Sequence, residues 1–176
     1  MKKIIILLFL LLPAFAFAQN KLTLAHFWSI PWGLSIERVE EILLERGLTG
    51  IRDNHALITT ADYEGEEGTM VFLFSRANRF HSGIVIYPAS ENNVLDRYDH
   101  YRLVLARRYG MPDTAVEFFE PPFQKGDGKE VDAIMTDNAF YFTEWEFGNG
   151  GLASVTIFNS LDVGLTFRNP GYADRN

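Results

Sequence analysis

FWSIPWGLSIERV, residues 27–39, decides how the chain folds, because it joins a short aromatic segment to the clearest helix start in the sequence. Ser35 is a favoured N-cap residue, and Glu37 places a negative charge in the first turn, where the helix dipole stabilises it. Apolar residues then recur at helical spacing until Gly47, which suits the left-handed end of a helix. These signals predict a helix over residues 35–46.

A second helix is indicated by an apolar and aromatic stripe at helical spacing in the middle of the chain. Arg107 and Arg108 fall in its last turn, which is the favourable end for positive charge. Gly110 follows as a helix stop. The pattern predicts a helix over residues 94–109.

Strand-like runs follow each predicted helix and are rich in β-branched and aromatic residues. They cover residues 55–63, 69–75 and 79–87 in the first half, and residues 114–119, 130–136, 139–147, 152–159 and 162–168 in the second. Between two of these runs, Asp137-Asn138 is predicted to form a tight hairpin turn.

The chain therefore shows the same pattern twice, a helix followed by an antiparallel meander, over residues 33–88 and 92–168. Neither meander easily buries its sheet face alone, so one shared sheet with both helices packed on one face is the economical arrangement. The predicted fold class is α+β, in a single domain over residues 19–170. The polar tail at residues 171–176 is expected to be frayed.

The N-terminus has the composition of a secretory signal peptide. Two lysines and a short apolar run precede Ala16-Phe17-Ala18, which has the small-residue pattern of a cleavage site. We therefore expect residues 1–18 to be removed before Gln19. The apolar run is shorter than the ~20 residues that cross a bilayer, and no cysteine follows to carry a lipid anchor. The mature chain is expected to be exported, periplasmic or secreted, without a transmembrane segment.

Charge and cysteine content narrow the function classes. Without residues 1–18 the chain keeps 14 basic and 23 acidic residues, a formal charge of −9. Such a chain repels phosphate backbones, so nucleic acid is not an expected partner. With no cysteine there is no disulfide, and stability must come from the core.

Two motifs also resemble those of known exported proteins. Residues 32–39 resemble the helix entry of the BamE-like (SmpA/OmlA) outer-membrane assembly lipoproteins, and residues 107–112 look like a helix exit found in related secreted proteins. The resemblance implies a compact α+β fold, sometimes doubled as in the β-lactamase-inhibitor-protein-like architecture. It also implies a location in the bacterial cell envelope.

No catalytic or metal-binding motif is present. The G-x-S-x-G pattern of a nucleophile elbow is missing, and the histidines lack the spacing of metal ligands. Glu144 and Glu146 are two residues apart on a predicted strand, so they share a half-exposed face while Trp145 points to the buried one. We predict no catalytic residue, metal ligand or cofactor. The four histidines are His26, His55, His81 and His100.

Several aromatic residues fall in segments that read as loops or arms rather than as strands. Exposed apolar patches on soluble proteins tend to mark partner surfaces. These residues are therefore the candidate binding surface, and the alternative is that they simply cover one end of the sheet as part of the core. The residues are Phe27, Trp28, Trp32, Phe119 and Phe123.

Three functions remain open. The favoured one is an exported non-enzymatic binding or scaffolding module of the bacterial cell envelope, with another envelope protein as its partner. The first alternative is a carrier that holds a lipid or other apolar small molecule between sheet and helices, and the second is a hydrolase with a dispersed site. A flat exposed aromatic patch would favour the binding module, a sealed apolar cavity the carrier, and two histidines beside an acidic residue in a pocket the hydrolase.

Overall fold

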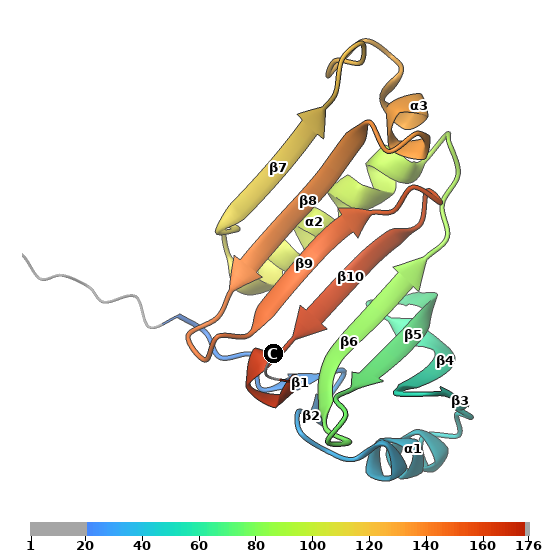
Figure 1. The fold of residues 1–176 in the computed structure, drawn as a ribbon, viewed down its shortest axis with the longest axis vertical. Coiled ribbons are helices and arrows are strands. Elements are labelled where there is room, and N and C mark those ends of the chain that lie inside the picture. Colours follow the sequence, from blue (N-terminus) through green and yellow to red (C-terminus); the bar gives the residue numbers. More distant parts are fainter. Residues whose placement is uncertain (1–20, 175–176) are drawn as a thin grey trace, which may run out of the picture.

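An eight-stranded antiparallel sheet organises residues 21–174, which are the residues that the computed structural model describes (Figure 1). Three α-helices and a small two-stranded sheet complete the fold, so the predicted α+β class is confirmed. The predicted signal peptide, residues 1–18, lies outside the described residues. None of the helices within residues 21–174 has the length and apolar character that a membrane crossing requires.

Two four-stranded meanders join edge to edge to form the sheet, in the order β3-β4-β5-β6-β10-β9-β8-β7. The central pair is β6 with β10, where Ile86 lies opposite Gly164. The strands of the first half are β3 (Ile51–Asp53), β4 (Ala56–Tyr63), β5 (Glu66–Phe74) and β6 (Phe80–Tyr87). Those of the second half are β7 (Thr114–Phe119), β8 (Ala139–Glu146), β9 (Leu152–Ile157) and β10 (Val163–Arg168).

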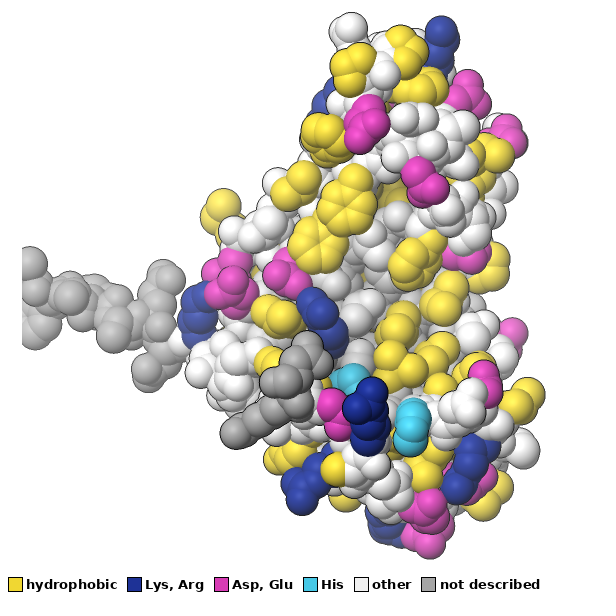
Figure 2. Space-filling view, in the orientation of Figure 1, with side chains coloured by type: hydrophobic (Ala, Val, Ile, Leu, Met, Phe, Trp, Pro, Cys, Tyr) yellow, Lys and Arg dark blue, Asp and Glu magenta, His cyan; other side chains and the backbone are white. Residues whose placement is uncertain are grey.

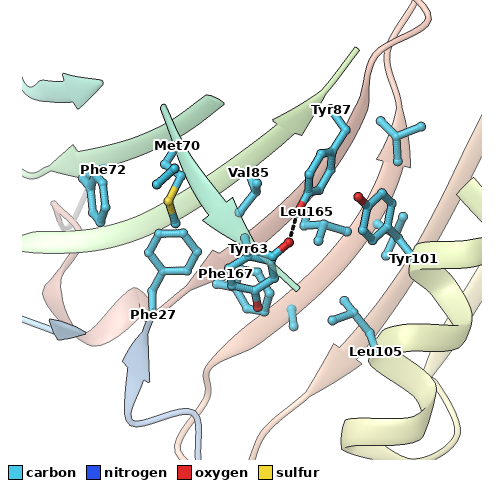
Figure 3. Close-up of a cluster of buried hydrophobic side chains, with 14 of the residues drawn as sticks. Phe27, Tyr63, Met70, Phe72, Val85, Tyr87, Tyr101, Leu105, Leu165 and Phe167 are labelled. Atoms are coloured by element: carbon cyan, nitrogen blue, oxygen red, sulfur yellow. Dashed lines mark hydrogen bonds between the residues drawn. The ribbon is translucent and has the colours of Figure 1, made fainter. Parts of the chain in front are cut away.

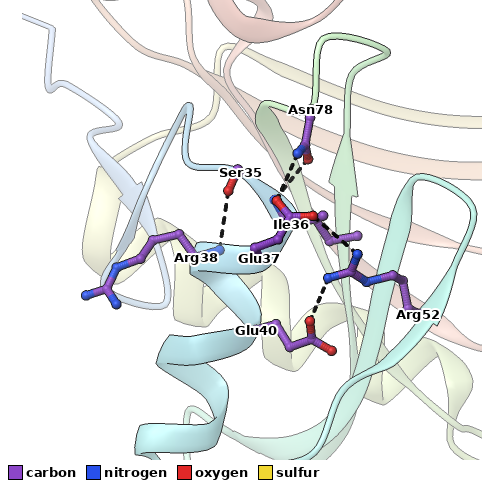
Figure 4. Close-up of polar contacts among 7 residues, drawn as sticks. All are labelled: Ser35, Ile36, Glu37, Arg38, Glu40, Arg52 and Asn78. Carbon is purple, nitrogen blue, oxygen red and sulfur yellow. Dashed lines mark hydrogen bonds and ion pairs between the residues drawn. The ribbon is translucent and has the colours of Figure 1, made fainter.

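Helix α1 (Ile36–Glu45) has the ends that its sequence predicts. Ser35 Oγ accepts a hydrogen bond from the backbone N–H of Arg38 at 3.4 Å, as an N-cap does (Figure 4). At the other end Gly47 has a φ of 76°. The N–H of Leu48 then donates to the carbonyl of Leu43 at 2.9 Å, which closes the helix in a Schellman motif.

Helix α2 (Val94–Tyr109) matches its predicted bounds. It lies behind the sheet in Figure 1 and contacts β9 and β10, whereas α1 lies at the lower end of the sheet and contacts β4. Tyr98 and Tyr101 are buried on the side of α2 that meets the sheet. The Tyr98 hydroxyl lies 2.7 Å from Thr143 Oγ1, and the Tyr101 ring stacks on Tyr87 with 4.3 Å between the centroids.

The N-terminal segment closes the core beneath the first half of the sheet. Strands β1 (His26–Phe27) and β2 (Ile30–Pro31) form a two-residue hairpin that inserts the Phe27 ring among buried side chains (Figure 3). The ring centroid of Phe27 lies 5.5 Å from that of Phe72 and 5.4 Å from that of Phe167. Gly83 makes room for this ring, because a Cβ there would lie 2.2 Å from Phe27 Cδ1.

The prediction of a strand over residues 130–136 is wrong, because this segment forms helix α3 (Glu130–Met135). Ala133 and Ile134 are both buried, whereas neighbouring residues of a strand point to opposite faces. Asp137-Asn138 is therefore a helix end and not a hairpin turn. Asp137 has a φ of 57°, and the Asn138 N–H donates to the Ala133 carbonyl at 2.7 Å.

The C-terminal tail contacts the body of the protein as far as the structure describes it, to residue 174. A short 3₁₀ turn, η1 (Pro170–Tyr172), places the Tyr172 ring directly over Gly33. The carboxylate of Asp174 then accepts a 3.0 Å hydrogen bond from the backbone N–H of Arg76. These contacts fix the tail against the first half of the chain.

Candidate functional site: an uncovered sheet face

The two faces of the second half of the sheet differ in what covers them. Along β8, Tyr141, Thr143 and Trp145 are buried against α2 and the core, while the alternate residues Phe140 and Phe142 point the other way. In Figure 1 no helix of the described chain lies in front of β7 to β10. We call this uncovered side the open face.

An apolar cluster occupies the open face. Phe118 is 52% exposed and Phe140 is 47% exposed, which is far more than a core aromatic residue. Figure 2 shows large hydrophobic side chains gathered on this side of the molecule. We define the open-face patch as the following residues: Val116 and Phe118 of β7, Phe140 and Phe142 of β8, and Phe158, which follows β9.

The sheet register holds these side chains together. Val116 lies directly opposite Phe142, and Phe118 lies opposite Phe140. The rings of Phe140 and Phe142 are stacked, with centroids 5.7 Å apart and an interplanar angle of 16°. Four of the five residues therefore sit on two paired strands, which fix their positions before any partner arrives.

Phe158 extends the patch towards the middle of the sheet. Its ring lies over Gly164 of β10, where a Cβ would come within 2.5 Å of Phe158 Cε2. Gly164 is opposite Thr156 of β9, and Thr156 is opposite Phe142. The aromatic surface thus crosses from the sheet edge to its centre.

Charged side chains border the patch at one end. Arg168 Nη2 lies 3.4 Å from Glu144 Oε2, and Lys21 Nζ lies 2.8 Å from Asp113 and 3.4 Å from Glu146. The hydrogen bond from Lys21 lowers the pKa of Asp113. Polar residues at the margin of an exposed apolar centre are common in protein interfaces.

The predicted aromatic surface does not form, because its members are dispersed and partly buried. Phe27 is 1% exposed, and Trp32 is buried with its Nε1–H donating to the Leu24 carbonyl at 2.9 Å. Both side chains belong to the core, because the β1–β2 hairpin draws this segment into it. Trp28 is half-buried, with the Arg46 guanidinium 4.4 Å from its ring centroid.

The other two predicted residues lie near the far end of β7. Phe119 is half-buried and meets Tyr141 edge-on, with centroids 5.8 Å apart. Phe123 is half-buried in the loop that follows Pro121-Pro122. In Figure 1 this end of β7 and the β1–β2 hairpin lie at opposite ends of the molecule, so the five residues share no common surface.

Sequence reasoning missed Phe140 and Phe142, although a signal for them was present. The prediction that Trp145 is buried opposite a half-exposed face carrying Glu144 and Glu146 is confirmed. Extending the same two-residue alternation back along the strand places Phe140 and Phe142 on that half-exposed face.

A cleft of about 500 Å³ lies between the N-terminal segment, the β4–β5 turn and the end of α2. Arg108 and Glu64 form an ion pair in its wall, and burial raises the pKa of the neighbouring Tyr63 hydroxyl. His26 is the histidine that lines it. The cleft is therefore open and charged, in contrast to the sealed apolar cavity that a lipid carrier needs.

The described part of the chain contains no group of three or more histidine, aspartate or glutamate side chains arranged to hold a metal ion. No family model, no curated protein and no solved structure matches this chain.

Proposed function

We propose that this chain is an exported, non-enzymatic binding module of the bacterial cell envelope, which engages another envelope protein through the open-face patch. The observation that carries the proposal is the exposure of Phe118 and Phe140 on paired strands of a sheet face that no described helix covers. Large exposed apolar patches with polar borders are characteristic of surfaces that bind other proteins.

The chemistry of the patch supports a protein as the partner. Aromatic side chains offer a large contact area with few rotatable bonds, so they lose little conformational entropy on binding. Here the Phe140 and Phe142 rings are already stacked on each other. A partner that covers them gains apolar burial at little ordering cost, as in interface hot spots.

The carrier and hydrolase alternatives have less support. The space between sheet and helices is filled by buried side chains such as Trp145, Tyr87 and Phe72. The 500 Å³ cleft has an Arg108–Glu64 ion pair in its wall and one lining histidine, His26. It therefore matches neither a lipid cavity nor a pair of histidines beside an acid.

Photo-cross-linking tests the proposal. Benzoyl-phenylalanine placed at position 140 of the full chain, in its native cells, is expected to give an adduct with another envelope protein on irradiation. The matched control is position 103, because Leu103 is equally exposed, at 47%, but lies on α2 behind the sheet. No adduct at position 140, or equal yields at both positions, would contradict the proposal.

Export is tested separately. Cell fractionation followed by N-terminal sequencing is expected to recover a chain that begins at Gln19 outside the cytoplasm. A chain that retains Met1 and stays in the cytoplasm would contradict the envelope location while leaving the binding surface untouched.

A further inference from the structure

Strand β7 ends the sheet on the side of the open-face patch. Its sheet partner is β8 alone, and its outer edge meets no other strand of the described chain. Five of its six residues are exposed, and Phe119 is half-buried. An uncovered strand edge is a ready template for pairing with another chain.

The hydrogen-bond pattern shows which backbone groups point outward. The Glu120 N–H donates to the Asn138 carbonyl at 2.7 Å, and Glu120 directly follows β7. In an antiparallel pair, the backbone N–H and C=O groups of successive residues point alternately towards the neighbouring strand and away from it. The N–H and C=O groups of the even-numbered residues of β7 therefore point towards β8. The N–H and C=O groups of Ala115, Glu117 and Phe119 are therefore directed away from β8, towards the side where β7 has no strand neighbour within residues 21–174.

Strand β3, which ends the sheet on the opposite side, is protected against pairing. Strand β3 has only three residues, and Arg52 at its centre is bound to Glu37 and Glu40 of α1, at 3.2 and 2.6 Å. Short length and charge both discourage strand pairing. The contrast identifies β7 as the edge that remains open to a partner.

The two sides of β7 specify different chemistry. Val116 and Phe118 belong to the open-face patch, so a strand added beside them continues the apolar surface if it carries apolar residues there. On the other side Glu117 points towards α2 and forms an ion pair with Lys125. A cation therefore already fits this carboxylate, and a basic residue on an added strand can take the same place.

We infer that β7 receives an extended strand of the partner protein, with apolar residues on the open-face side and a basic residue opposite Glu117. The inference rests on the proposed function and specifies its mode of binding. A second copy of this chain fits less well. Antiparallel pairing of two β7 strands about Glu117 sets the two carboxylates opposite each other, and like charges there are destabilising. The mature chain also carries a formal charge of −9, which disfavours self-association.

Proline substitutions on the outer edge test the inference. Glu117→Pro and Ala115→Pro each remove an outward N–H while leaving the N–H groups that pair with β8. Their matched controls, Glu117→Ala and Ala115→Val, change the same side chains but keep the N–H. Each substitution is introduced into the full chain that carries the cross-linker at position 118, and folding is checked by circular dichroism and thermal unfolding.

Both proline variants are expected to lower the yield of the cross-linked adduct about tenfold or more, since each loses a backbone hydrogen bond and distorts the pairing edge. Glu117→Ala should lower it only severalfold, through the lost charge, and Ala115→Val should lower it far less than Ala115→Pro, because the N–H group is kept. In hydrogen exchange on the purified complex, the amides of residues 115, 117 and 119 should become protected.

If both proline variants fold and still give the adduct, strand addition is overturned. The proposed function stands in that case, provided that position 140 still cross-links. An adduct with twice the mass of the chain overturns the assignment of a different protein in favour of a second copy. If the unmodified chain gives no adduct at position 140, the proposed function fails, and strand addition fails with it.

Discussion

The hydroxyl of Tyr101 donates a 2.6 Å hydrogen bond to Glu66 Oε2, and this contact joins the helix of the second half to the meander of the first. Arg97 Nη1 lies 2.5 Å from the other oxygen of the same carboxylate. Burial raises the pKa of Glu66, but the hydrogen bond from Tyr101 and the contact with Arg97 outweigh it, so the net pKa is lowered. Glu66 therefore remains ionised and ties α2 to the start of β5.

Replacing Tyr101 by phenylalanine removes this hydrogen bond while keeping the buried ring that stacks on Tyr87. We expect the free energy of unfolding to fall by about 1–2 kcal/mol, because a hydrogen bond to a partly exposed charged group is lost. Urea denaturation of the single variants Tyr101→Phe and Glu66→Gln and of the double variant measures the coupling. Strictly additive effects would show that the two side chains do not stabilise each other.

Glu37 is expected to make stability depend on pH. A 2.9 Å hydrogen bond from the Asn78 amide, with the helix N-terminus and Ser35, lowers the pKa of Glu37 from 4.5 to about 2 (Figure 4). Because the folded pKa lies below the unfolded one, the ionised carboxylate stabilises the fold above about pH 4.5. That contribution should be lost as the pH falls from about 4.5 to about 2, and Glu37→Gln should abolish this part of the profile.

The Asn78 contact is tested by measuring the Glu37 pKa with NMR in Asn78→Gly. The side-chain amide is lost, so the pKa should rise towards its ordinary value. Glycine is chosen because Asn78 has a φ of 55°, a left-handed conformation that would strain alanine. An unchanged pKa would mean that the helix N-terminus, Ser35 and Arg52 hold the carboxylate ionised without Asn78.

The patch residues should be dispensable for folding. Phe118→Ser and Phe140→Ser are each expected to lower the free energy of unfolding by less than about 1 kcal/mol, since both side chains are half exposed in the free chain. Phe72→Ala is the contrasting core variant and should cost about 3–5 kcal/mol. Urea denaturation gives both values. A large loss at Phe140 would assign it to the core.

The helices were predictable because their signals are local. Ser35, Gly47 and Gly110 act within a few residues of the helix ends that they define. Residues 130–136 gave no such signal, because a six-residue segment containing valine, isoleucine and methionine is compatible with either strand or helix. The helix is favoured because it buries Ala133 and Ile134 together. Their burial depends on the packing of this segment against β8.

The candidate site was harder to predict, because exposure depends on distant contacts. The sequence around Phe27 is compatible with a short strand or an extended arm, and the burial of its ring depends on the space that Gly83 provides from far away in the sequence. The alternation along β8 placed Phe140 on the side of Glu144 and Glu146, but the sequence alone did not indicate that no helix covers that side.

Two glycines that face aromatic rings provide a last prediction. A Cβ at Gly83 would lie 2.2 Å from the Phe27 ring, and one at Gly164 would lie 2.5 Å from the Phe158 ring. Neither glycine has a left-handed φ, so the comparison isolates the steric conflict. Phe27 is 1% exposed and packed among other aromatic rings, whereas Phe158 is 37% exposed and free to swing outward.

Gly83→Ala should therefore lower the free energy of unfolding by about 2–3 kcal/mol, because the displaced Phe27 ring presses on its buried neighbours. Gly164→Ala should cost less than about 1 kcal/mol, because Phe158 moves into solvent. Thermal and urea unfolding of the two variants, with Phe27→Leu added to Gly83→Ala, provide the test. The smaller leucine should restore part of the stability lost at Gly83. Equal losses in the two alanine variants would mean that Phe158 is held as firmly as Phe27, and that the open-face patch is less accessible than its exposure suggests.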